Sequence, residues 1–161
     1  MEANDVIKLY KLLKENCIEV WIDGGWGIDA LLGEQTRSHD DLDIAIERKN
    51  VEKLRHLLNE QGYKEKKRSS DWNFVLVNGS KEIDIHVFEF DDKGNNIYGI
   101  AYPKESLAGM GIIDGNTVRC ISPEWVIKFH ENYGSKDKDF KDIQALCDQF
   151  DIELPKNYKK L

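Results

Sequence analysis

Short apolar runs, glycine turns and stretches of helical periodicity follow one another along the chain. Residues 20–22 form a short apolar run just before Gly24 and Gly25, which is typical of a buried strand followed by a tight turn. Residues 28–32 then show apolar positions at helical spacing, and Gly33 is placed to end that helix. The pattern predicts a strand, a glycine turn and a helix in direct succession.

An alternating stretch comes next. From Asp41 to Ile46 apolar residues alternate with Asp41, Asp43 and an alanine, which predicts a strand with one buried face. Both carboxylates then project from the other face, about one pleat repeat (~7 Å) apart. They repel each other unless a cation lies between them, so the spacing indicates a divalent metal ion. Gly24 and Gly25 have no β-carbon and would let a phosphate approach the free amides of the helix that follows them.

The rest of the chain shows further strand and helix patterns. Asn78-Gly79-Ser80 separates two apolar-rich runs and is a strong hairpin signal, because Asn-Gly tolerates positive φ. Residues 97–115 carry scattered glycines without a clear period, so we expect a mobile surface loop there. The expected strands cover residues 63–67, 72–77, 82–90 and 118–121, and the expected helices begin at Asn4 or Asp5, at Asn50, at Ser122-Pro123 and at about Asp139.

Strands interleaved with helices, together with one hairpin, indicate an α/β (α+β) fold in which helices flank a mixed β-sheet. The length of 161 residues is most simply one domain over residues 1–161. We expect its core to cover about residues 1–121 and a C-terminal helical segment to cover about residues 122–161.

Charge and composition narrow the class of partner. The net charge of −7 and the pI near 5.2 argue against a nucleic-acid partner, because binding to phosphates needs an excess of Lys and Arg. No apolar run approaches the ~20 residues of a membrane span, and the N-terminus lacks the pattern of a signal peptide. We therefore expect a cytoplasmic protein without a membrane partner, in which Cys17, Cys120 and Cys147 are buried free thiols.

A third carboxylate lies on a later strand. Between residues 82 and 90, apolar residues occupy one face, whereas Glu82, Asp84 and His86 share the other, which is too polar for a core. If this strand lies beside the Asp41–Asp43 strand, Asp84 completes a cluster of three acids. Three acids on neighbouring strands, a glycine turn and a helix N-terminus are the components of two-metal phosphoryl chemistry.

Three sequence strings carry a family resemblance. G-G-W-G-I-D-A and R-S-H-D-D-L-D-I, followed by I-D-I-H, resemble the small antibiotic nucleotidyltransferases of the polymerase-beta-like superfamily, in particular the lincosamide and the aminoglycoside 2''-nucleotidyltransferases. The match is close over residues 20–46 and clear again over residues 82–86. The spacer before Asp41 is long for the superfamily, and residues 97–115 match no particular relative, which leaves the acceptor open.

The resemblance implies roles for the motif residues. Asp41 and Asp43 would hold Mg²⁺, Asp84 would act as general base and as a metal ligand, and Gly24 and Gly25 would receive the triphosphate. The implied fold is the polymerase-beta-like nucleotidyltransferase fold with a short C-terminal helical part. The implied cofactors are two Mg²⁺ ions, with ATP or another nucleoside triphosphate as co-substrate.

The implied reaction moves a nucleoside monophosphate from ATP to a hydroxyl of a lincosamide or an aminoglycoside and releases pyrophosphate. Two other classes fit the same motifs. One is a nucleotidyltransferase that modifies a protein, as in antitoxin modules, and the other is a non-catalytic nucleotide-binding module. A homodimer is also open, because a neighbour's C-terminal helices could complete a cleft built by one domain.

Four cationic side chains are candidates for binding the nucleotide. Arg37 would pair either with the triphosphate, which its fork suits, or with Asp40. His39 would contact phosphate or cap the loop. Lys138 and Lys141 enter the last expected helix, where they would reach the β- and γ-phosphates or remain solvated.

Four further residues are candidates for binding the acceptor. Trp72 and Tyr102 could supply apolar faces, although core packing is the usual role of a tryptophan such as Trp72. His86 shares the face of Asp84 and would line the pocket or serve as a structural histidine. Glu89 belongs to an acidic stretch that would attract a cationic acceptor or simply be solvated.

Overall fold

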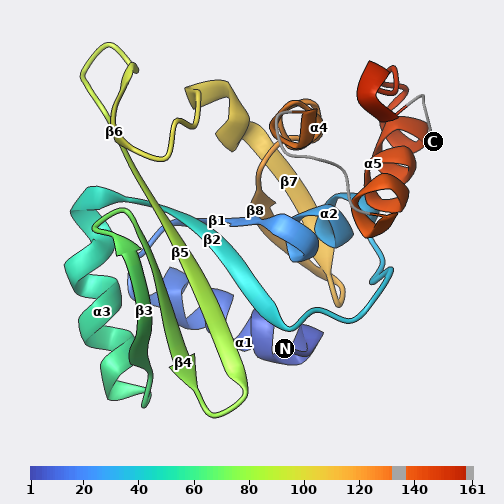
Figure 1. Ribbon diagram of the computed structural model, residues 1–161. Coiled ribbons are helices and arrows are strands. Elements are labelled where there is room, and N and C mark those ends of the chain that lie inside the picture. Colours follow the sequence, from blue (N-terminus) through green and yellow to red (C-terminus); the bar gives the residue numbers. More distant parts are fainter. Residues whose placement is uncertain (132–136, 159–161) are drawn as a thin grey trace.

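The computed structural model describes residues 1–131 and 137–158, which form one eight-stranded sheet with helices packed against it (Figure 1). The α-helices are α1 (Ala3–Glu15), α2 (Gly24–Leu32), α3 (Val51–Glu60), α4 (Pro123–Glu131) and α5 (Asp137–Phe150), and the short 3-10 helices are η1 (Arg48–Asn50), η2 (Lys104–Ala108) and η3 (Lys156–Tyr158). The strands are β1 (Val20–Asp23), β2 (Asp41–Glu47), β3 (Lys64–Ser70), β4 (Asn73–Asn78), β5 (Lys81–Phe90), β6 (Asn96–Gly99), β7 (Gly109–Ile113) and β8 (Asn116–Cys120).

The sheet is mixed, as the sequence predicts. Its strand order is β3-β4-β5-β2-β1-β8-β7, and β6 pairs with β5. The pairs β2/β5 and β1/β8 are parallel, and the other pairs are antiparallel. The expected fold class is therefore confirmed.

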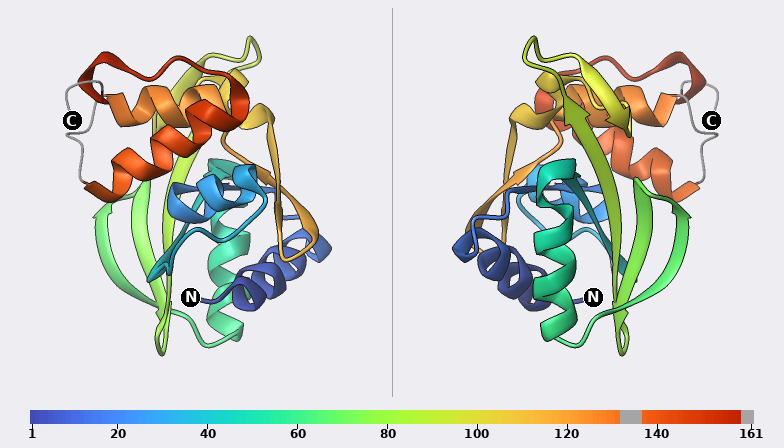
Figure 2. Two further views of the ribbon diagram at one scale, coloured as in Figure 1. Left: turned by 90° about the vertical axis from the view of Figure 1, so that its right-hand side faces the viewer. Right: turned by 90° about the vertical axis from the view of Figure 1, so that its left-hand side faces the viewer.

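The register of the central strands follows from one apolar face. β2 and β5 align three apolar residues each, all six of them buried: Leu42, Ile44 and Ile46 against Ile83, Ile85 and Val87. Helices α1 and α3 cover this face, while α2, α4 and α5 lie on the other side (Figure 1, Figure 2). Because side chains alternate along a strand, the same register brings the polar residues of β2 and β5 together on the opposite face.

The structure contradicts the expectation of a mobile loop over residues 97–115. This stretch contains the end of β6, η2 and the whole of β7. A β-carbon at Gly111 would lie 2.4 Å from the carbonyl oxygen of Ala30 on α2, and one at Gly109 would lie 2.5 Å from that of Cys120. These glycines allow β7 to pack tightly against its neighbours. They reflect close packing, whereas the expectation from the sequence took them as a sign of flexibility.

Other elements agree with the sequence pattern more closely. The 78–80 hairpin, the strand near residues 118–121 and the helix after Ser122 are confirmed, and Gly33 ends α2 with a φ of 78°. The first helix begins at Ala3, with Glu2 as its N-cap, rather than at Asn4 or Asp5. The expectation of three buried thiols is wrong for Cys17, which is exposed.

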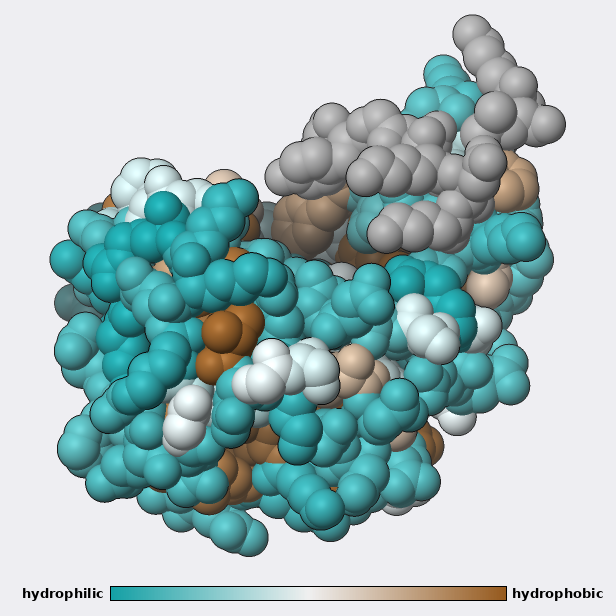
Figure 3. Space-filling model, turned by 60° about the horizontal axis from the view of Figure 1, so that its bottom comes forward, coloured by the Kyte–Doolittle hydropathy of each residue, from teal (hydrophilic) through white to brown (hydrophobic). Residues whose placement is uncertain are grey.

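The surface offers no broad apolar area on the side seen in Figure 3, where hydrophilic side chains cover most of the coloured atoms and hydrophobic ones form small separate spots. Among residues 1–131 and 137–158, no helix has both the length and the apolar character needed to span a membrane.

Replacing Gly111 by alanine tests the packing of β7 on α2. The added β-carbon would collide with the backbone of Ala30, so we expect Gly111→Ala to lower the free energy of unfolding by about 1–3 kcal/mol in urea titrations. Met110→Ala is the matched control on the same strand, because Met110 is 57% exposed, and it should change stability by less than about 0.5 kcal/mol. Equal stability of the two variants would contradict this packing.

Candidate active site

Three aspartates stand side by side across the centre of the sheet. Strand pairing aligns Asp23 of β1 with Asp43 of β2, and Asp43 with Asp84 of β5. Their side chains are 19%, 22% and 28% exposed, respectively. Asp41, two residues before Asp43, pairs with Glu82 and is exposed at the edge of this row. The structure thus brings Asp84 to the same face as Asp41 and Asp43, as the sequence predicted, and adds Asp23.

His86 lies among the three carboxylates of this row. Its Nε2 atom is 3.8 Å from Asp43 Oδ1 and 3.6 Å from Asp84 Oδ1, and its Nδ1 atom is 3.7 Å from Asp23 Oδ2. Burial alone would lower the pKa of His86, but the neighbouring carboxylates of Asp23, Asp84 and Asp43 outweigh burial and raise this pKa to about 10. The ring is therefore a cation that offsets part of the negative charge of the row.

Asp43 bears the largest electrostatic cost in the row. Burial raises its pKa, and so do the charges of Asp23, Asp41 and Asp84, while His86 acts in the opposite direction; the resulting pKa of Asp43 is about 7. A carboxyl group of this kind is fully ionised when a divalent cation binds it. The site therefore favours the binding of a further cation in addition to the charged ring of His86.

The donor atoms of the row fit a metal ion. A carboxylate oxygen of Asp43 and one of Asp84 lie within 4.8 Å of each other and of a ring nitrogen of His86. Asp84 Oδ1 is buried and has no hydrogen-bond partner in the described part of the chain. A buried oxygen without a partner is costly, and carboxylate oxygens are the ligands that Mg²⁺ prefers. The residues present therefore fit a divalent cation held between β2 and β5.

Gly24 and Gly25 open α2 directly beside this row. Asp23 caps the helix, because its Oδ1 accepts a hydrogen bond of 2.8 Å from the amide of Gly24. Gly24 has a φ of +57°, and a β-carbon there would lie 2.1 Å from Asp43 Oδ2. A β-carbon at Gly25 would lie 2.3 Å from His39 Nδ1. The glycine pair thus makes room for neighbouring side chains of the site at the helix N-terminus.

A buried acid, Asp29, anchors the loop between α2 and β2 through hydrogen bonds. Asp29 Oδ1 accepts hydrogen bonds from the amide and the hydroxyl of Thr36, and its Oδ2 lies 2.5 Å from His39 Nε2. His39 is buried against Trp26, with ring centroids 4.8 Å apart. This arrangement favours the loop-capping role that the sequence left open for His39.

Arg37, in the same loop, pairs with a residue other than Asp40. Its Nε and Nη2 atoms each donate to Asp142 Oδ2 of α5 at 3.2 Å. A local sequence pattern does not reveal this pairing, because the two residues are 105 positions apart in the chain.

A cleft of about 340 Å³ lies over Asp23, Asp43 and His86. Tyr102, which is buried, donates a hydrogen bond of 2.5 Å from its hydroxyl to Asp23 Oδ2. The residues that line the cleft come from β1, α2, β2, β4, β5, the segment after β6, and α4: Asp23, Gly24, Asp43, Asn73, His86, Ile100, Ala101, Tyr102, Val126, Phe129 and His130.

Other candidates from the sequence lie away from this cleft. Trp72 is 42% exposed and packs edge-on against Tyr98, so the expectation that it packs in the core is wrong. Glu89 forms an ion pair of 3.0 Å with Arg48. Lys141 is exposed on α5. The side chain of Lys138 lies outside the described residues.

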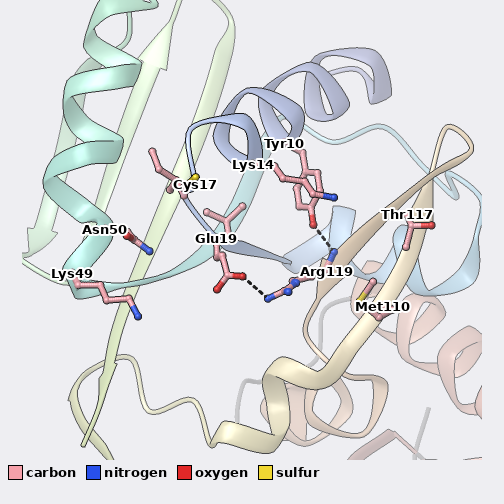
Figure 4. A pocket seen from close by; sticks show the side chains of 11 residues that line it. Tyr10, Lys14, Cys17, Glu19, Lys49, Asn50, Met110, Thr117 and Arg119 are labelled. Carbon is pink, nitrogen blue, oxygen red and sulfur yellow. Dashed lines mark hydrogen bonds and ion pairs between the residues drawn. The ribbon is translucent and has the colours of Figure 1, made fainter.

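A larger cavity of about 590 Å³ lies at the other end of β1, between α1, η1 and the β7–β8 hairpin (Figure 4). Its centre is crossed by an ion pair of 3.1 Å between Glu19 and Arg119, and the amide of Arg119 donates to the hydroxyl of Tyr10 at 3.0 Å. None of the site residues expected from the sequence is among the described residues that line it. The smaller cleft over the carboxylates is therefore the candidate site.

A family model decides the identity of the chain. The model described as aminoglycoside-2''-adenylyltransferase matches residues 5–146, a span that contains the whole carboxylate row and the glycine pair. The chain belongs to this family. It is a nucleotidyltransferase, as the sequence resemblance implied.

Individual relatives of the 2''-adenylyltransferase family agree with this assignment. The chain is 31% identical to a 2''-aminoglycoside nucleotidyltransferase of Escherichia coli over 133 residues, which cover 79% of this chain and 73% of that protein. It is 28% identical to a lincosamide resistance protein of Staphylococcus haemolyticus over 148 residues, or 88% of this chain and 89% of that protein.

Two solved structures have a similar fold. ANT(2'')-Ia in complex with adenylyl-2''-tobramycin is 26% identical and superposes with a TM-score of 0.78, over 92% of this chain and 88% of that chain. The lincosamide adenylyltransferase LnuA, in its lincomycin-bound form, is 24% identical and has a TM-score of 0.80, over 95% and 99% of the two chains. The latter likeness shows the fold alone.

Local sequence patterns did not identify every residue of the candidate site. They grouped Asp41, Asp43 and Asp84, and Asp23 stands in the carboxylate row beside Asp43. The alternation of Asp84 and His86 signalled a shared face, although nothing in the sequence placed His86 between three acids. Asp142 gave no signal, because its partner Arg37 comes from a distant loop.

Acid titration of stability tests the role of Asp29. Burial would raise the pKa of Asp29, but hydrogen bonds from His39 and Thr36 outweigh burial and lower it. A lowered folded-state pKa stabilises the fold above the unfolded value of about 3.9, and this contribution is lost as the pH falls through the folded value. Asp29→Asn should therefore cost about 1–3 kcal/mol of unfolding free energy at pH 7, with a smaller difference from wild type below about pH 4.

Urea titrations between pH 3 and pH 7 provide the measurement. Asp92→Asn, which removes an exposed acid in a turn, is the control and should leave stability nearly unchanged. A deficit for Asp29→Asn that stays constant over the whole pH range would contradict the role given to its charge.

Proposed function

We propose that this nucleotidyltransferase moves the adenosine monophosphate unit of ATP to a hydroxyl of a small antibiotic and releases pyrophosphate. The observation that carries the proposal is the in-register pair of Asp43 and Asp84, with the buried Asp84 Oδ1 lacking a hydrogen-bond partner among the described residues. The neighbouring N-terminus of α2 supports a triphosphate site next to the pair. We expect the reaction to take place in the cytoplasm, where ATP and Mg²⁺ are available.

The proposed cofactors of this row are two Mg²⁺ ions. Asp43 and Asp84 would hold them, with Asp41 at the edge of the row as a further ligand. When bound, Mg²⁺ supplies positive charge against the triphosphate and lowers the pKa of the acceptor hydroxyl.

The side chains of the site then have distinct tasks. Asp84 takes the proton of the acceptor hydroxyl while the hydroxyl oxygen attacks the α-phosphorus of ATP. The bond between the α-phosphorus and the bridging oxygen breaks, and pyrophosphate leaves with that oxygen. The turn of Gly24 and Gly25 and the guanidinium of Arg37 bind the triphosphate. His86 is held by Asp23 and limits repulsion among the acids.

The walls of the cleft favour a lincosamide over an aminoglycoside as acceptor. Ile100, Val126 and Phe129 form an apolar side that suits the alkylated proline of a lincosamide. Glu89, the candidate for attracting a polycationic aminoglycoside, is already paired with Arg48. The described residues that line the cleft carry two acids, Asp23 and Asp43, which the proposal uses for other tasks.

Removing either central acid tests the catalytic assignment. Asp43→Asn and Asp84→Asn should each lower kcat/KM at least about 100-fold, because each removes a charge that stabilises the transition state. The measurement is pyrophosphate release with ATP, Mg²⁺ and an acceptor, with circular dichroism to confirm the fold. The exposed turn variant Asp92→Asn should react at close to the wild-type rate. Near-normal turnover in Asp84→Asn would refute its role as base.

A panel of acceptors tests the choice of antibiotic. With ATP and Mg²⁺, we expect faster pyrophosphate release with lincosamides than with aminoglycosides, and growth protection of expressing cells against lincosamides. Faster turnover with aminoglycosides would reverse the assignment. Radioactive label from ATP on a polypeptide, without turnover of either drug class, would instead support a protein-modifying enzyme, and ATP binding without pyrophosphate release would support a non-catalytic module.

A further inference from the structure

The guanidinium of Arg37 lies over the first turn of α2. A β-carbon at Gly25 would be 2.9 Å from Arg37 Nη2, whereas one at Gly24 would be 2.1 Å from Asp43 Oδ2. Because consecutive α-carbons are ~3.8 Å apart, the cation and the metal-binding carboxylate face neighbouring residues of one helix turn. In the proposed function this turn receives the triphosphate.

A buried acid of the C-terminal helix holds that guanidinium. Asp142 on α5 is 6% exposed, and its Oδ2 accepts from both Nε and Nη2 of Arg37 at 3.2 Å. Arg37 Nη1 donates in addition to the carbonyl oxygen of Ser38 at 3.3 Å. Of the five N–H donors of an arginine, these bonds use three. Two donors are left without a partner among the described residues.

We propose that Asp142 is a positioning residue for the nucleotide. It holds the guanidinium of Arg37 over the N-terminus of α2 before ATP binds. The two remaining N–H groups can then donate to a phosphate of ATP, and binding does not have to order the side chain. The inference rests on the proposed function, because it takes the ligand at this turn to be a nucleoside triphosphate. Its physical basis is that an orientation fixed before binding is not an entropic cost of binding.

Loss of a positioning residue should change ATP binding specifically, whereas loss of a purely structural residue should not. A lone arginine on a loop keeps its charge but samples many rotamers, so it binds phosphate less well. The acceptor site, which lies over the carboxylate row and along α4, should be unaffected. The signature is therefore a rise in the KM for ATP at an unchanged KM for the acceptor.

The test compares ATP binding and kinetics of the wild type, Asp142→Asn, Arg37→Gln and the double variant. Asp142→Asn should raise the KM for ATP and the Kd of ATP with Mg²⁺, measured by calorimetry, by about 10-fold, the equivalent of one charge-assisted hydrogen bond. In the Arg37→Gln background, the same substitution should cause no further rise, because the group that Asp142 positions is gone.

Two further variants keep the proposal testable if Asp142→Asn is poorly folded. Arg37→Lys keeps the charge but not the fork, and it should weaken ATP binding in a folded protein. Glu65→Gln removes an ion pair with Arg55, outside the residues that line the active-site cleft, and it should leave ATP binding unchanged.

The outcomes separate this inference from the proposed function. If the wild type neither binds ATP nor releases pyrophosphate, the proposed function fails. If the wild type binds ATP, but folded Asp142→Asn and Arg37→Lys bind it equally well, only the positioning role is overturned. An equal loss of ATP affinity from Asp142→Asn with and without Arg37 would overturn it too, because Asp142 would then act through another group.

Discussion

Electrostatic repulsion between carboxylates is the constraint on which this structure depends. Strand register places Asp23, Asp43 and Asp84 next to one another on a half-buried face, where each charge raises the cost of the next. His86, drawn in between them, offsets part of that cost, and Tyr102 donates a hydrogen bond to Asp23. The pKa of Asp43 near 7 shows that the offset is incomplete. A divalent cation is the partner that such a site favours.

The apolar face of the sheet fixes the geometry of this polar row. A slip of one residue between β2 and β5 would move the buried isoleucines to the wrong side, so the hydrophobic contacts determine which acids meet. Close packing also sets the geometry at the start of α2, where glycines let Asp43 and His39 approach the helix. Core packing and loop anchoring thus hold the carboxylates close together, although their mutual repulsion favours a wider separation.

Local patterns in the sequence predicted the parts of the site but not all of their neighbours. Period-two alternation identified β2 and β5 and the face of Asp84, because alternation is a local property of a strand. The β7 strand was missed, because Gly109 and Gly111 look like loop residues in the sequence, whereas in the fold Gly111 packs against α2 and Gly109 packs against Cys120. The pairing of Arg37 with Asp142 and the place of His86 depend on contacts between distant segments, which no local pattern reports.

The central claim is that Asp43 and Asp84 together hold a divalent cation at the start of α2. The most direct measurement is anomalous diffraction from crystals grown with Mn²⁺ and a non-hydrolysable ATP analogue. The account predicts a manganese peak between the carboxylates of Asp43 and Asp84, with the triphosphate over Gly24 and Gly25. A crystal with the nucleotide bound but with manganese away from both aspartates, for example in the cavity beside Arg119, would contradict it.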